Sequence, residues 1–230
     1  RDREIAGAEA APWHATPRVM VGIMTMVDEA PGRQIVRQTW AAPERLPDGM
    51  VVRFFMCERS AVDNTTTPLP AADIAAGDML VLPCRENMNE GKMLAYWTHA
   101  AAPGGPIDAL GLDFICKGDM DTFVLASELM EEAATLPRRG VVGGARKVTP
   151  VAPHRQSKVP AFATHISYMA GQFELLSADL VRWIAGSETA ARFASGPEDV
   201  MLGYWLHAGR FPHRGRLTYD WGHLDPCRPW

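Results

Sequence analysis

Apolar positions along the chain follow two patterns, and these patterns alternate. Short continuous apolar runs predict buried strands, whereas apolar residues that recur at three and four positions predict helices packed on one side. Strands that alternate with helices imply an α/β fold, with a mostly parallel, Rossmann-like central sheet flanked by helices. The predicted strands are Arg18–Thr25, Met50–Cys57, Asp78–Pro83, Leu112–Cys116 and His165–Ser177. The predicted helices are Arg33–Trp40, a helix around Met93, Leu94 and Trp97, Ala126–Leu136, Ala178–Ala185, and a helix opened by Ser195–Val200.

The segments outside this alternation suggest how the domain is organised. Residues 1–17 are polar and alanine-rich and are expected to form a lead-in. Residues 18–230 are expected to form one domain, because 230 residues with 47% hydrophobic content are sufficient for one core. Residues 140–163 carry Gly, Pro, Lys and Arg without periodicity, which predicts a long irregular loop.

Charge and hydropathy indicate which kinds of molecule the protein is expected to bind. The net charge is −4, and no basic stripe with interleaved aromatic residues occurs, so nucleic acid is not an expected partner. Small polar or neutral partners fit better. No apolar run reaches about 18 residues, so no membrane span is expected within the given chain. The chain starts on Arg-Asp-Arg-Glu, which is not a signal peptide.

The four cysteines, at positions 57, 84, 116 and 227, form no CxxC pair and no zinc-binding spacing. Cys57 and Cys116 lie in apolar strands, where a buried thiol is expected. Pairing among Cys57, Cys84 and Cys227 stays open. Asn64-Thr65-Thr66 is an N-glycosylation sequon in a loop-like stretch, which mildly favours the secretory pathway because sequons often arise by chance.

Two carboxylates follow the strand Leu112–Cys116. Gly118 breaks the apolar run just before Asp119 and Asp121. Alternate side chains of an extended segment share a face, so both carboxylates are expected to point the same way while Met120 points back into packing. Ligands bind beyond the carboxyl ends of strands in open α/β sheets, and paired carboxylates suit Mg²⁺ or Mn²⁺. This pattern predicts a cation site that leaves room for a diphosphate, although a lone Asp-x-Asp is more often a polar turn.

Two further pairs of charged residues have two interpretations each. Arg33 and Arg37 are four apart on one helix face and are either solvated or a clamp for an anion. Glu198 and Asp199 follow Pro197 at a predicted helix start, where acids either stabilise the helix end or serve the site.

Five segments of the chain follow one another in a specific order. They are Arg33–Trp40, an acidic loop leading to Gly91-Lys92, Lys117–Val124, a glycine-containing strand that ends on Leu176-Ser177, and Glu198–Gly203. This succession resembles the β1,3-galactosyltransferase family of glycosyltransferases (GT31-like), whose catalytic domains have the GT-A fold. The matched segments run from about Thr25 to Gly203 and cover most of the chain.

The resemblance implies a metal-dependent, inverting hexosyltransferase. Such an enzyme moves a hexose or N-acetylhexosamine, galactose first among them, from a UDP-sugar to a glycan or glycoprotein hydroxyl in a β1,3-type linkage. In this family Mn²⁺, or Mg²⁺ in its place, bridges the two phosphates of the donor. Asp121 matches the direct metal ligand, and Asp119 matches the residue that contacts the metal or the nucleotide sugar. His223 is the expected third ligand, with His207 and His213 as alternatives, and Asp199 matches the catalytic base.

The resemblance also implies a set of nucleotide and sugar contacts. Arg37, Asp78 and Lys92 each have an alternative role, as a surface ion pair or a solvated charge. The expected contacts are Thr25, Arg33, Arg37, Asp78, Lys92, Asp119 and Gly171.

The chain departs from the family pattern at three places, one of which is the strand end Phe54–Cys57, where a glycine common in the family is missing. Family members usually carry three consecutive acids where this chain has Asp119-Met120-Asp121, and a second glycine and a tyrosine where it has Phe173 and Glu174. These departures leave a second hypothesis open, a nucleotide-sugar-binding module with impaired turnover. A metal-dependent phosphohydrolase is a third, disfavoured because no early Asp-x-Asp and no two-metal cluster is visible. The resemblance further implies residence in the Golgi lumen, with a membrane anchor, if one exists, upstream of Arg1.

Overall fold

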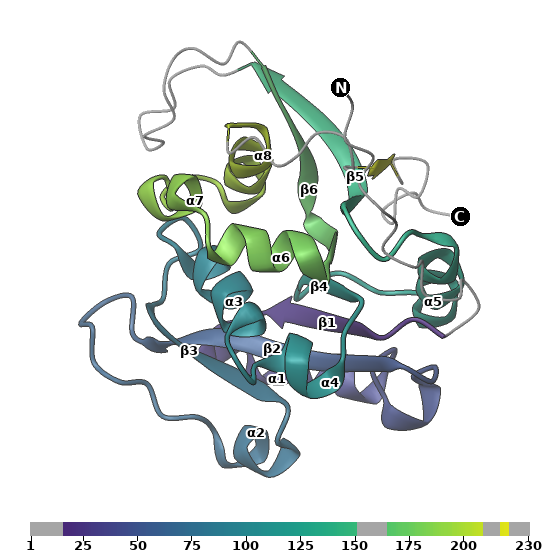
Figure 1. Ribbon diagram of the computed structural model, residues 1–230. Coiled ribbons are helices and arrows are strands. Elements are labelled where there is room, and N and C mark those ends of the chain that lie inside the picture. The colour runs from purple at the N-terminus through teal and green to yellow at the C-terminus, as the bar shows by residue number, and fades with distance from the viewer. Residues whose placement is uncertain (1–15, 151–164, 209–216, 221–230) are drawn as a thin grey trace, which may run out of the picture.

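A seven-stranded sheet forms the centre of the protein (Figure 1). The computed structural model describes residues 16–150, 165–208 and 217–220. The strand order is β3-β2-β1-β4-β6-β5-β7, and the first four of these strands run parallel to one another. Strand β6 is antiparallel to both β4 and β5, and β7 is parallel to β5. The strands are β1 Val19–Met24, β2 Met50–Arg59, β3 Met79–Arg85, β4 Phe114–Asp119, β5 Val141–Pro150, β6 His165–Ser177 and β7 Leu217–Asp220.

Helices cover both faces of this sheet, so the predicted α/β fold with a mostly parallel sheet is confirmed. Each predicted strand and each predicted helix has a counterpart in the structure, while α2, α4 and α7 were not predicted. The helices are α1 Ala30–Gln38, α2 Ala71–Ala76, α3 Lys92–Ala101, α4 Pro106–Leu110, α5 Ala126–Thr135, α6 Ala178–Ala185, α7 Glu188–Arg192 and α8 Glu198–Ala208, with 3-10 turns η1 Val27–Glu29 and η2 Pro43–Arg45.

Alternation along β1 divides the hydrophobic core in two. Val19, Val21 and Ile23 face a cluster that includes residues of α1 and α5, whereas Met20 and Met24 face the cluster that contains residues of α3, α6 and α8. All six residues of β1 are buried. A strand that is covered on both faces has no polar side, which is why β1 reads as one continuous apolar run in the sequence.

Gly22 allows α3 to approach the sheet closely. A Cβ at this position of β1 would lie 2.2 Å from the hydroxyl oxygen of Tyr96, far inside any real contact. The Tyr96 hydroxyl donates a hydrogen bond of 2.9 Å to the carbonyl oxygen of Cys116 on β4, and its ring stacks on Phe55 of β2. Tyr96 therefore fixes α3, and the lysine at its start, against three neighbouring strands.

The prediction of an irregular loop over 140–163 is wrong for its first part, because residues 141–150 form strand β5. The segment Val141–Pro150 contains Gly143, Gly144 and two cations, and such a composition obscures the strand pattern. Pairing with β6 supplies the backbone hydrogen bonds instead, and the two strands extend as a ribbon away from the rest of the sheet (Figure 1). Residues 151–164 lie outside the described part.

Cys116 is a buried free thiol, as expected. The same expectation is wrong for Cys57, which forms a disulfide with Cys84. The register of β2 and β3 shifts between the pairs Cys57–Leu82 and Arg59–Arg85. The extra residue of β3 within this irregularity accompanies the approach of Cys84 to Cys57. Cys227 lies outside the described residues. Among the described residues, no helix combines the length and the apolar content needed to cross a bilayer.

Candidate active site

A cavity of about 540 Å³ opens at the carboxyl ends of β1 and β4. This is the edge of a parallel sheet where ligands are expected. The end of β1, turn η1, the loops after β2 and β3, the first residue of α3 and the end of β4 all contribute to its wall. The lining residues are Met24, Thr25, Met26, Glu29, Ala61, Glu86, Asn87, Met88, Lys92, Asp119, Met120 and Asp121.

Asp119 and Asp121 both line this cavity, but strand alternation is not what brings them together. Strand β4 ends at Asp119, and Asp121 lies in the turn that follows, where the amide of Thr122 donates to the carbonyl oxygen of Asp119 at 3.1 Å. The Thr122 hydroxyl donates to the carbonyl oxygen of Gln172 at 2.8 Å and ties this turn to β6. Met120 packs against the core as expected, yet it also lines the cavity, so the expectation that it turns away is only half right.

Acidic groups outnumber basic groups in the cavity wall. The wall carries Glu29, Glu86, Asp119 and Asp121 against the single cation Lys92. The described residues contain no ready-made cluster of three or more metal-binding side chains. Two carboxylates still fit a hard cation that takes its other ligands from water and a diphosphate. Asp121 is exposed, whereas one oxygen of Asp119 pairs with Lys117 at 2.7 Å.

Lys92 is buried in the cavity wall, and its ammonium contacts two oxygen atoms. Its ammonium donates to the carbonyl oxygen of Thr25 at 2.7 Å and forms an ion pair with Glu86. Burial lowers the pKa of Lys92, and the charge of Glu86 opposes that shift. Gly91 adopts the left-handed conformation (φ 88°) directly before this helix start. The glycine-lysine pair thus turns the chain so that Lys92 connects the ends of β1 and β3.

Lys117 lies at the centre of a second, largely buried group of charges. Its side chain is fully buried, and its ammonium contacts the carbonyl oxygen of Gly171, Asp119 at 2.7 Å and Glu198 at 3.2 Å. Burial acts to lower the pKa of Lys117, but the surrounding carboxylates, Glu174 first, outweigh it and the pKa is raised. Lys117 therefore connects the carboxyl end of β4 to the start of α8.

Glu174 faces Lys117 across the β4–β6 pairing and is completely buried. Neither of its carboxylate oxygens has a hydrogen-bond partner within the described structure. Burial raises the pKa of Glu174 well above its ordinary value, and the positive charge of Lys117 only partly opposes this. Burial therefore disfavours the charged form of Glu174, while the neighbouring ammonium of Lys117 favours it.

Asp199 stands in the first turn of α8, close to Gly171. Its carboxylate accepts hydrogen bonds from the amides of Gly171 at 3.3 Å and Val200 at 2.7 Å. Burial, and next the charge of Glu198, raise the pKa of Asp199, whereas a helix start by itself lowers it. Asp199 is thus a stronger base than the sequence predicted. It does not line the cavity, and Glu198 and Lys117 connect it to Asp119.

Gly171 lies beside this charge cluster. A Cβ at Gly171 would lie 2.6 Å from a carboxylate oxygen of Glu198 and 3.3 Å from the Lys117 ammonium. The absence of a side chain there allows the acids of α8 to approach β6. In the described structure Gly171 is a neighbour of Asp199 and is not part of the cavity wall.

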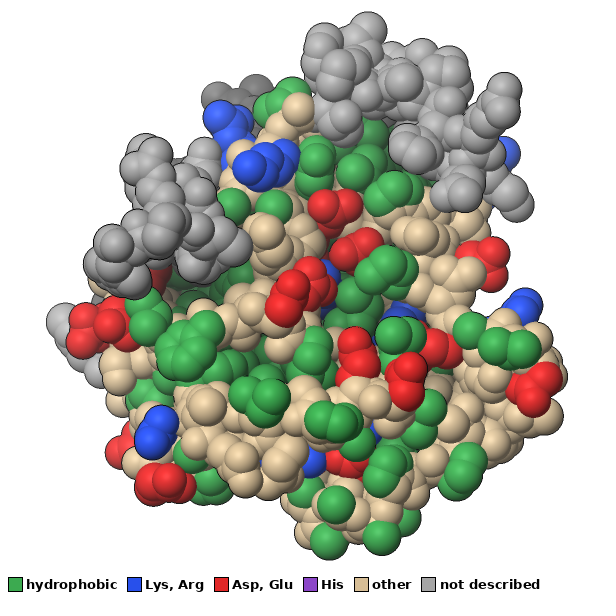
Figure 2. Space-filling model, turned by 180° about the vertical axis from the view of Figure 1, so that it is seen from behind, with side chains coloured by type: hydrophobic (Ala, Val, Ile, Leu, Met, Phe, Trp, Pro, Cys, Tyr) green, Lys and Arg blue, Asp and Glu red, His purple; other side chains and the backbone are tan. Residues whose placement is uncertain are grey.

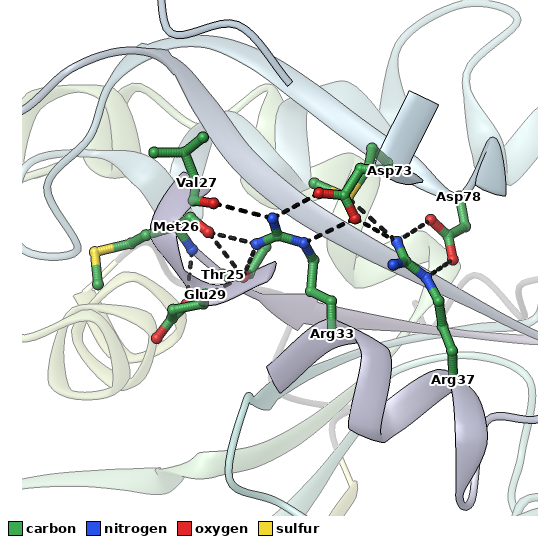
Figure 3. A network of polar contacts seen from close by, with 9 residues as sticks. Thr25, Met26, Val27, Glu29, Arg33, Arg37, Asp73 and Asp78 are labelled. Atoms are coloured by element: carbon green, nitrogen blue, oxygen red, sulfur yellow. Dashed lines mark hydrogen bonds and ion pairs between the residues drawn. The ribbon is translucent and has the colours of Figure 1, made fainter. Parts of the chain in front are cut away.

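Arg33 and Arg37 flank the carboxylate of Asp73, away from the cavity wall (Figure 3). Arg33 is fully buried, and it also donates to the Thr25 hydroxyl at 2.8 Å and to the carbonyl oxygens of Met26 and Val27. The hydrogen bond from Arg33, and next that from Arg37, lower the pKa of Asp73 against the effect of burial. Arg33 thereby positions Thr25, which does line the cavity.

Arg37 forms a two-bond fork with Asp78, with distances of 2.8 Å and 2.7 Å (Figure 3). The hydrogen bond that Arg37 donates to Asp78 is the main cause of the raised pKa of Arg37. The structure thus places Arg37 in an ion pair, which corresponds to its alternative role. Asp78 is the partner in this pair and is not the solvated charge considered as its alternative. Neither residue lines the cavity.

Of the expected site residues, the structure brings Thr25, Lys92, Asp119 and Asp121 together in the cavity, and it places Gly171 and Asp199 beside Lys117. His207 is exposed on α8 and does not line the cavity. His213 and His223 lie outside the described residues. Lys117 and Glu174 were not among the expected site residues. Lys117 could have been identified from its place in the segment Lys117–Val124, and Glu174 from its departure from the family pattern.

Figure 2 shows how charged side chains are distributed over one face of the molecule. On the face opposite to the view of Figure 1, acidic side chains gather toward the middle, while basic side chains occur singly or in small groups (Figure 2). Within the described part of this face no broad basic patch is present. The fold and the cavity together define an α/β protein with an acidic cavity at the carboxyl edge of its sheet.

The sequence places this protein in a family. A model of the family described as Galactosyltransferase matches residues 32–214. The chain therefore belongs to the galactosyltransferase family of glycosyltransferases, which confirms the resemblance and the expected GT-A fold. None of the curated proteins compared with the chain is a match.

One solved structure with a related shape is the mannosyltransferase PcManGT from Pyrobaculum calidifontis, in complex with GDP-Man and Mn²⁺. It shares 12% sequence identity with the chain at a TM-score of 0.45. The superposition covers 92% of this chain and 57% of that one, so the chain spans little more than half the length of the mannosyltransferase.

Proposed function

We propose that this glycosyltransferase is metal-dependent and inverting, and that it transfers a hexose or N-acetylhexosamine from a UDP-sugar to a glycan or glycoprotein hydroxyl in a β1,3-type linkage. Galactose is the first candidate sugar because of the family to which the chain belongs. The observation that carries this proposal is the shared position of Asp119 and Asp121 in one acidic cavity at the carboxyl edge of the sheet.

Asp119 and Asp121 are the residues that would hold Mn²⁺ or Mg²⁺ in this cavity. When bound, the cation would stabilise the negative charge that develops on the leaving diphosphate without a proton transfer. The chain's own residues prepare this site. The ion pair with Lys117 orients Asp119, and Lys92 fixes the ends of β1 and β3 that form the opposite wall.

Asp199 is the proposed catalytic base. Its carboxylate would take the proton of the acceptor hydroxyl while that oxygen forms a bond to the anomeric carbon, on the face opposite the breaking bond to UDP. The raised pKa of Asp199 supports this role, since a carboxylate with a higher pKa has a greater affinity for the proton. The amide of Gly171 holds the carboxylate in position.

Substitution of the two aspartates separates binding from transfer. We expect Asp121→Ala to abolish the Mn²⁺-dependent part of UDP binding, measured by calorimetry with and without EDTA. Asp199→Asn should bind UDP with unchanged affinity and lose transfer by about 100-fold or more, as is typical of a removed general base.

The matched control for Asp121→Ala is Glu131→Ala, which removes an acid that is also exposed, from α5. It should leave both binding and transfer unchanged. Near-normal transfer by Asp199→Asn would refute the assignment of the base. Unchanged metal-dependent binding by Asp121→Ala would refute the cation site.

A nucleotide-sugar-binding module with impaired turnover is the second candidate. One oxygen of Asp119 is occupied by Lys117, and Met120 stands where the family usually carries an acid. A panel of UDP-sugars distinguishes the two candidates. Stabilisation of the fold by a UDP-sugar with Mn²⁺, without transfer to any of a broad set of acceptors, would favour the binding module.

We also propose residence in the Golgi lumen. The disulfide between Cys57 and Cys84 supports this location, because disulfides persist in oxidising compartments and are rare in the cytosol. Fluorescence microscopy of the full-length protein with a Golgi marker tests it, and a cytosolic signal would contradict it.

A further inference from the structure

The loop after β2 carries a sequence motif that the proposed reaction does not use. The chain leaves β2 at Arg59, passes through the exposed residues 61–66, and forms an isolated bridge between Thr66 and Arg59. Asn64, Thr65 and Thr66, the only Asn-x-Ser/Thr sequon in the sequence, lie in this excursion. The whole sequon is exposed, and Val62 beside it is 91% exposed.

The loop holds its shape without the two side chains that define the sequon. The amides of Ser60 and Asn64 donate to the carbonyl oxygens of Thr65 and Ser60, at 2.8 Å and 3.2 Å. Asp63 accepts hydrogen bonds from both the amide and the hydroxyl of Thr65. Within the described structure, no hydrogen bond involves the side-chain amide of Asn64 or the hydroxyl of Thr66. Both groups are therefore available to a partner from solution.

Asn64 is also the one non-glycine residue of the described chain with a positive φ, at 59°. This conformation turns the chain sharply, and asparagine is among the few residues that tolerate it. Asn64 thus has a backbone role that is independent of its side-chain amide. A substitution that tests the amide has to preserve this turn.

The disulfide supplies the second condition for modification of a sequon. Cys57 and Cys84 enclose the loop, and their bond indicates a chain that matures in an oxidising compartment. Sequons are glycosylated in the lumen of the secretory pathway, on surface loops. An exposed sequon inside a disulfide-closed segment meets both requirements.

We propose that Asn64 carries an N-linked glycan. The donor is a lipid-linked oligosaccharyl diphosphate. The side-chain nitrogen of Asn64 loses a proton and forms a bond to the anomeric carbon of the oligosaccharide, while the bond from that carbon to the diphosphate breaks. The lipid diphosphate leaves with the electron pair, and the proton lost by Asn64 passes to this leaving group through the solvent. The inference rests on the proposed passage through the secretory pathway, but it does not depend on the transferase reaction.

The loop that would carry the glycan lies next to the cavity. Ala61, three residues before Asn64, lines the cavity, and its carbonyl oxygen accepts a hydrogen bond of 2.5 Å from Arg85. The glycan is thus attached near the rim of the cavity, on an exposed side chain, and it displaces no packing contact. We expect enzymatic removal of the glycan to leave the fold intact.

The experiment uses the full-length protein expressed in eukaryotic cells and analysed by peptide mass spectrometry. The wild-type peptide that contains Asn64 should carry a hexose and N-acetylhexosamine mass that is removed by peptide N-glycosidase. Thr66→Ala and Asn64→Gly should both lack this mass. Glycine tolerates the positive φ, so Asn64→Gly removes the acceptor and keeps the turn.

Two control variants change the same loop and keep the sequon. Thr65→Ala leaves Asn-Ala-Thr and Thr66→Ser leaves Asn-Thr-Ser, so both should remain glycosylated. An unmodified Asn64 in the wild-type protein would overturn the proposal, and so would a glycan on Asn64 in Thr66→Ala. A transferase assay on the same samples keeps this result separate from the proposed reaction, because an inactive but glycosylated protein would contradict only the latter.

Discussion

At the scale of single residues, several charged side chains that suggest ligand contacts in the sequence have partners within the protein. Arg33 and Arg37 share Asp73, and Arg37 also holds Asp78 in a two-bond fork. A sequence shows that two arginines share a helix face but not which acids lie opposite, since Asp73 is forty residues away from Arg33. Of these residues, only Thr25, which Arg33 positions, reaches the cavity.

Arg37→Ala tests whether this arginine is structural. It leaves Asp73 and Asp78 with fewer partners and removes the contact of the guanidinium with the Phe54 ring. We expect a loss of about 1–3 kcal/mol in unfolding free energy, between the values for exposed and buried ion pairs. Thermal denaturation measures this loss, and calorimetry should show an unchanged UDP affinity.

Arg37→Lys is the matched control, because it keeps the charge but not the planar fork. Its stability should lie between those of the wild type and Arg37→Ala. A clear loss of UDP affinity in a stably folded Arg37→Ala protein would instead make Arg37 a nucleotide contact, as the family resemblance implies.

At the scale of elements, the close packing of α8 on β6 determines where Asp199 lies. Gly203 is the contact point, because a Cβ there would lie 2.6 Å from the Cβ of Tyr168 and 2.7 Å from the carbonyl oxygen of Ser167. This contact explains the spacing between the acids and the glycine in Glu198–Gly203. The glycine lets the helix approach the strand, and the acids then meet Lys117 and Gly171 one turn earlier.

Gly203→Ala should therefore displace the start of α8. The backbone of β6 is in the way, so the helix has to move, and we expect a cost of about 1–3 kcal/mol, as for other overpacked sites. The melting temperature should fall, and transfer should fall more than UDP binding, because Asp199 moves while the cavity wall does not. Thermal denaturation and a full kinetic comparison check both effects.

The control is Gly186→Ala at the end of α6, where a Cβ would meet its nearest neighbour at an ordinary 3.7 Å. This variant should resemble the wild type. A Gly203→Ala protein with wild-type stability and transfer would show that α8 has room to adapt and that the glycine is dispensable.

The elements also show which parts of the fold a sequence can reveal. The buried parallel strands were predicted because both of their faces are apolar, and the helices because their apolar residues recur at the helical period. Strand β5 was missed because its two glycines and two cations carry neither pattern, and its pairing with β6 decides its structure. Asp119 and Asp121 were expected to lie together because alternate residues of a strand share a face. They do lie together, but a turn after the strand brings this about. The bond between Cys57 and Cys84 depends on a register shift that leaves no trace in composition.

At the scale of the whole molecule, the disulfide joins overall stability to the shape of the cavity. Cys57 and Cys84 are 27 residues apart, and a closed loop of this size contributes about 3.5 kcal/mol in the chain-entropy model. The amide of Cys57 donates to Glu86 at 3.0 Å, and Glu86 pairs with Lys92. The disulfide is therefore connected to the cavity wall through Glu86 and Lys92.

Reduction of the disulfide should lower the melting temperature by about 10 °C, given about 2–4 °C per kcal/mol for a chain of this size. It should also weaken UDP binding, because Glu86 and Lys92 lose a fixed support. Thermal denaturation and calorimetry with and without a reductant measure the two effects. The double variant Cys57→Ala with Cys84→Ala should be insensitive to the reductant, and a wild-type protein equally insensitive would contradict the role of the bond.

The buried ammonium of Lys117 has a consequence for how such an enzyme diversifies. One ammonium forms ion pairs with both Asp119, a proposed cation ligand, and Glu198, which is next to the proposed base. A mutation that removes the charge of either acid leaves the buried ammonium with one partner fewer in a medium of low polarity. Lineages that acquire a new donor preference through the end of β4 are therefore expected to change the first turn of α8 as well. We expect selection to act on the two ends of the proposed reaction together.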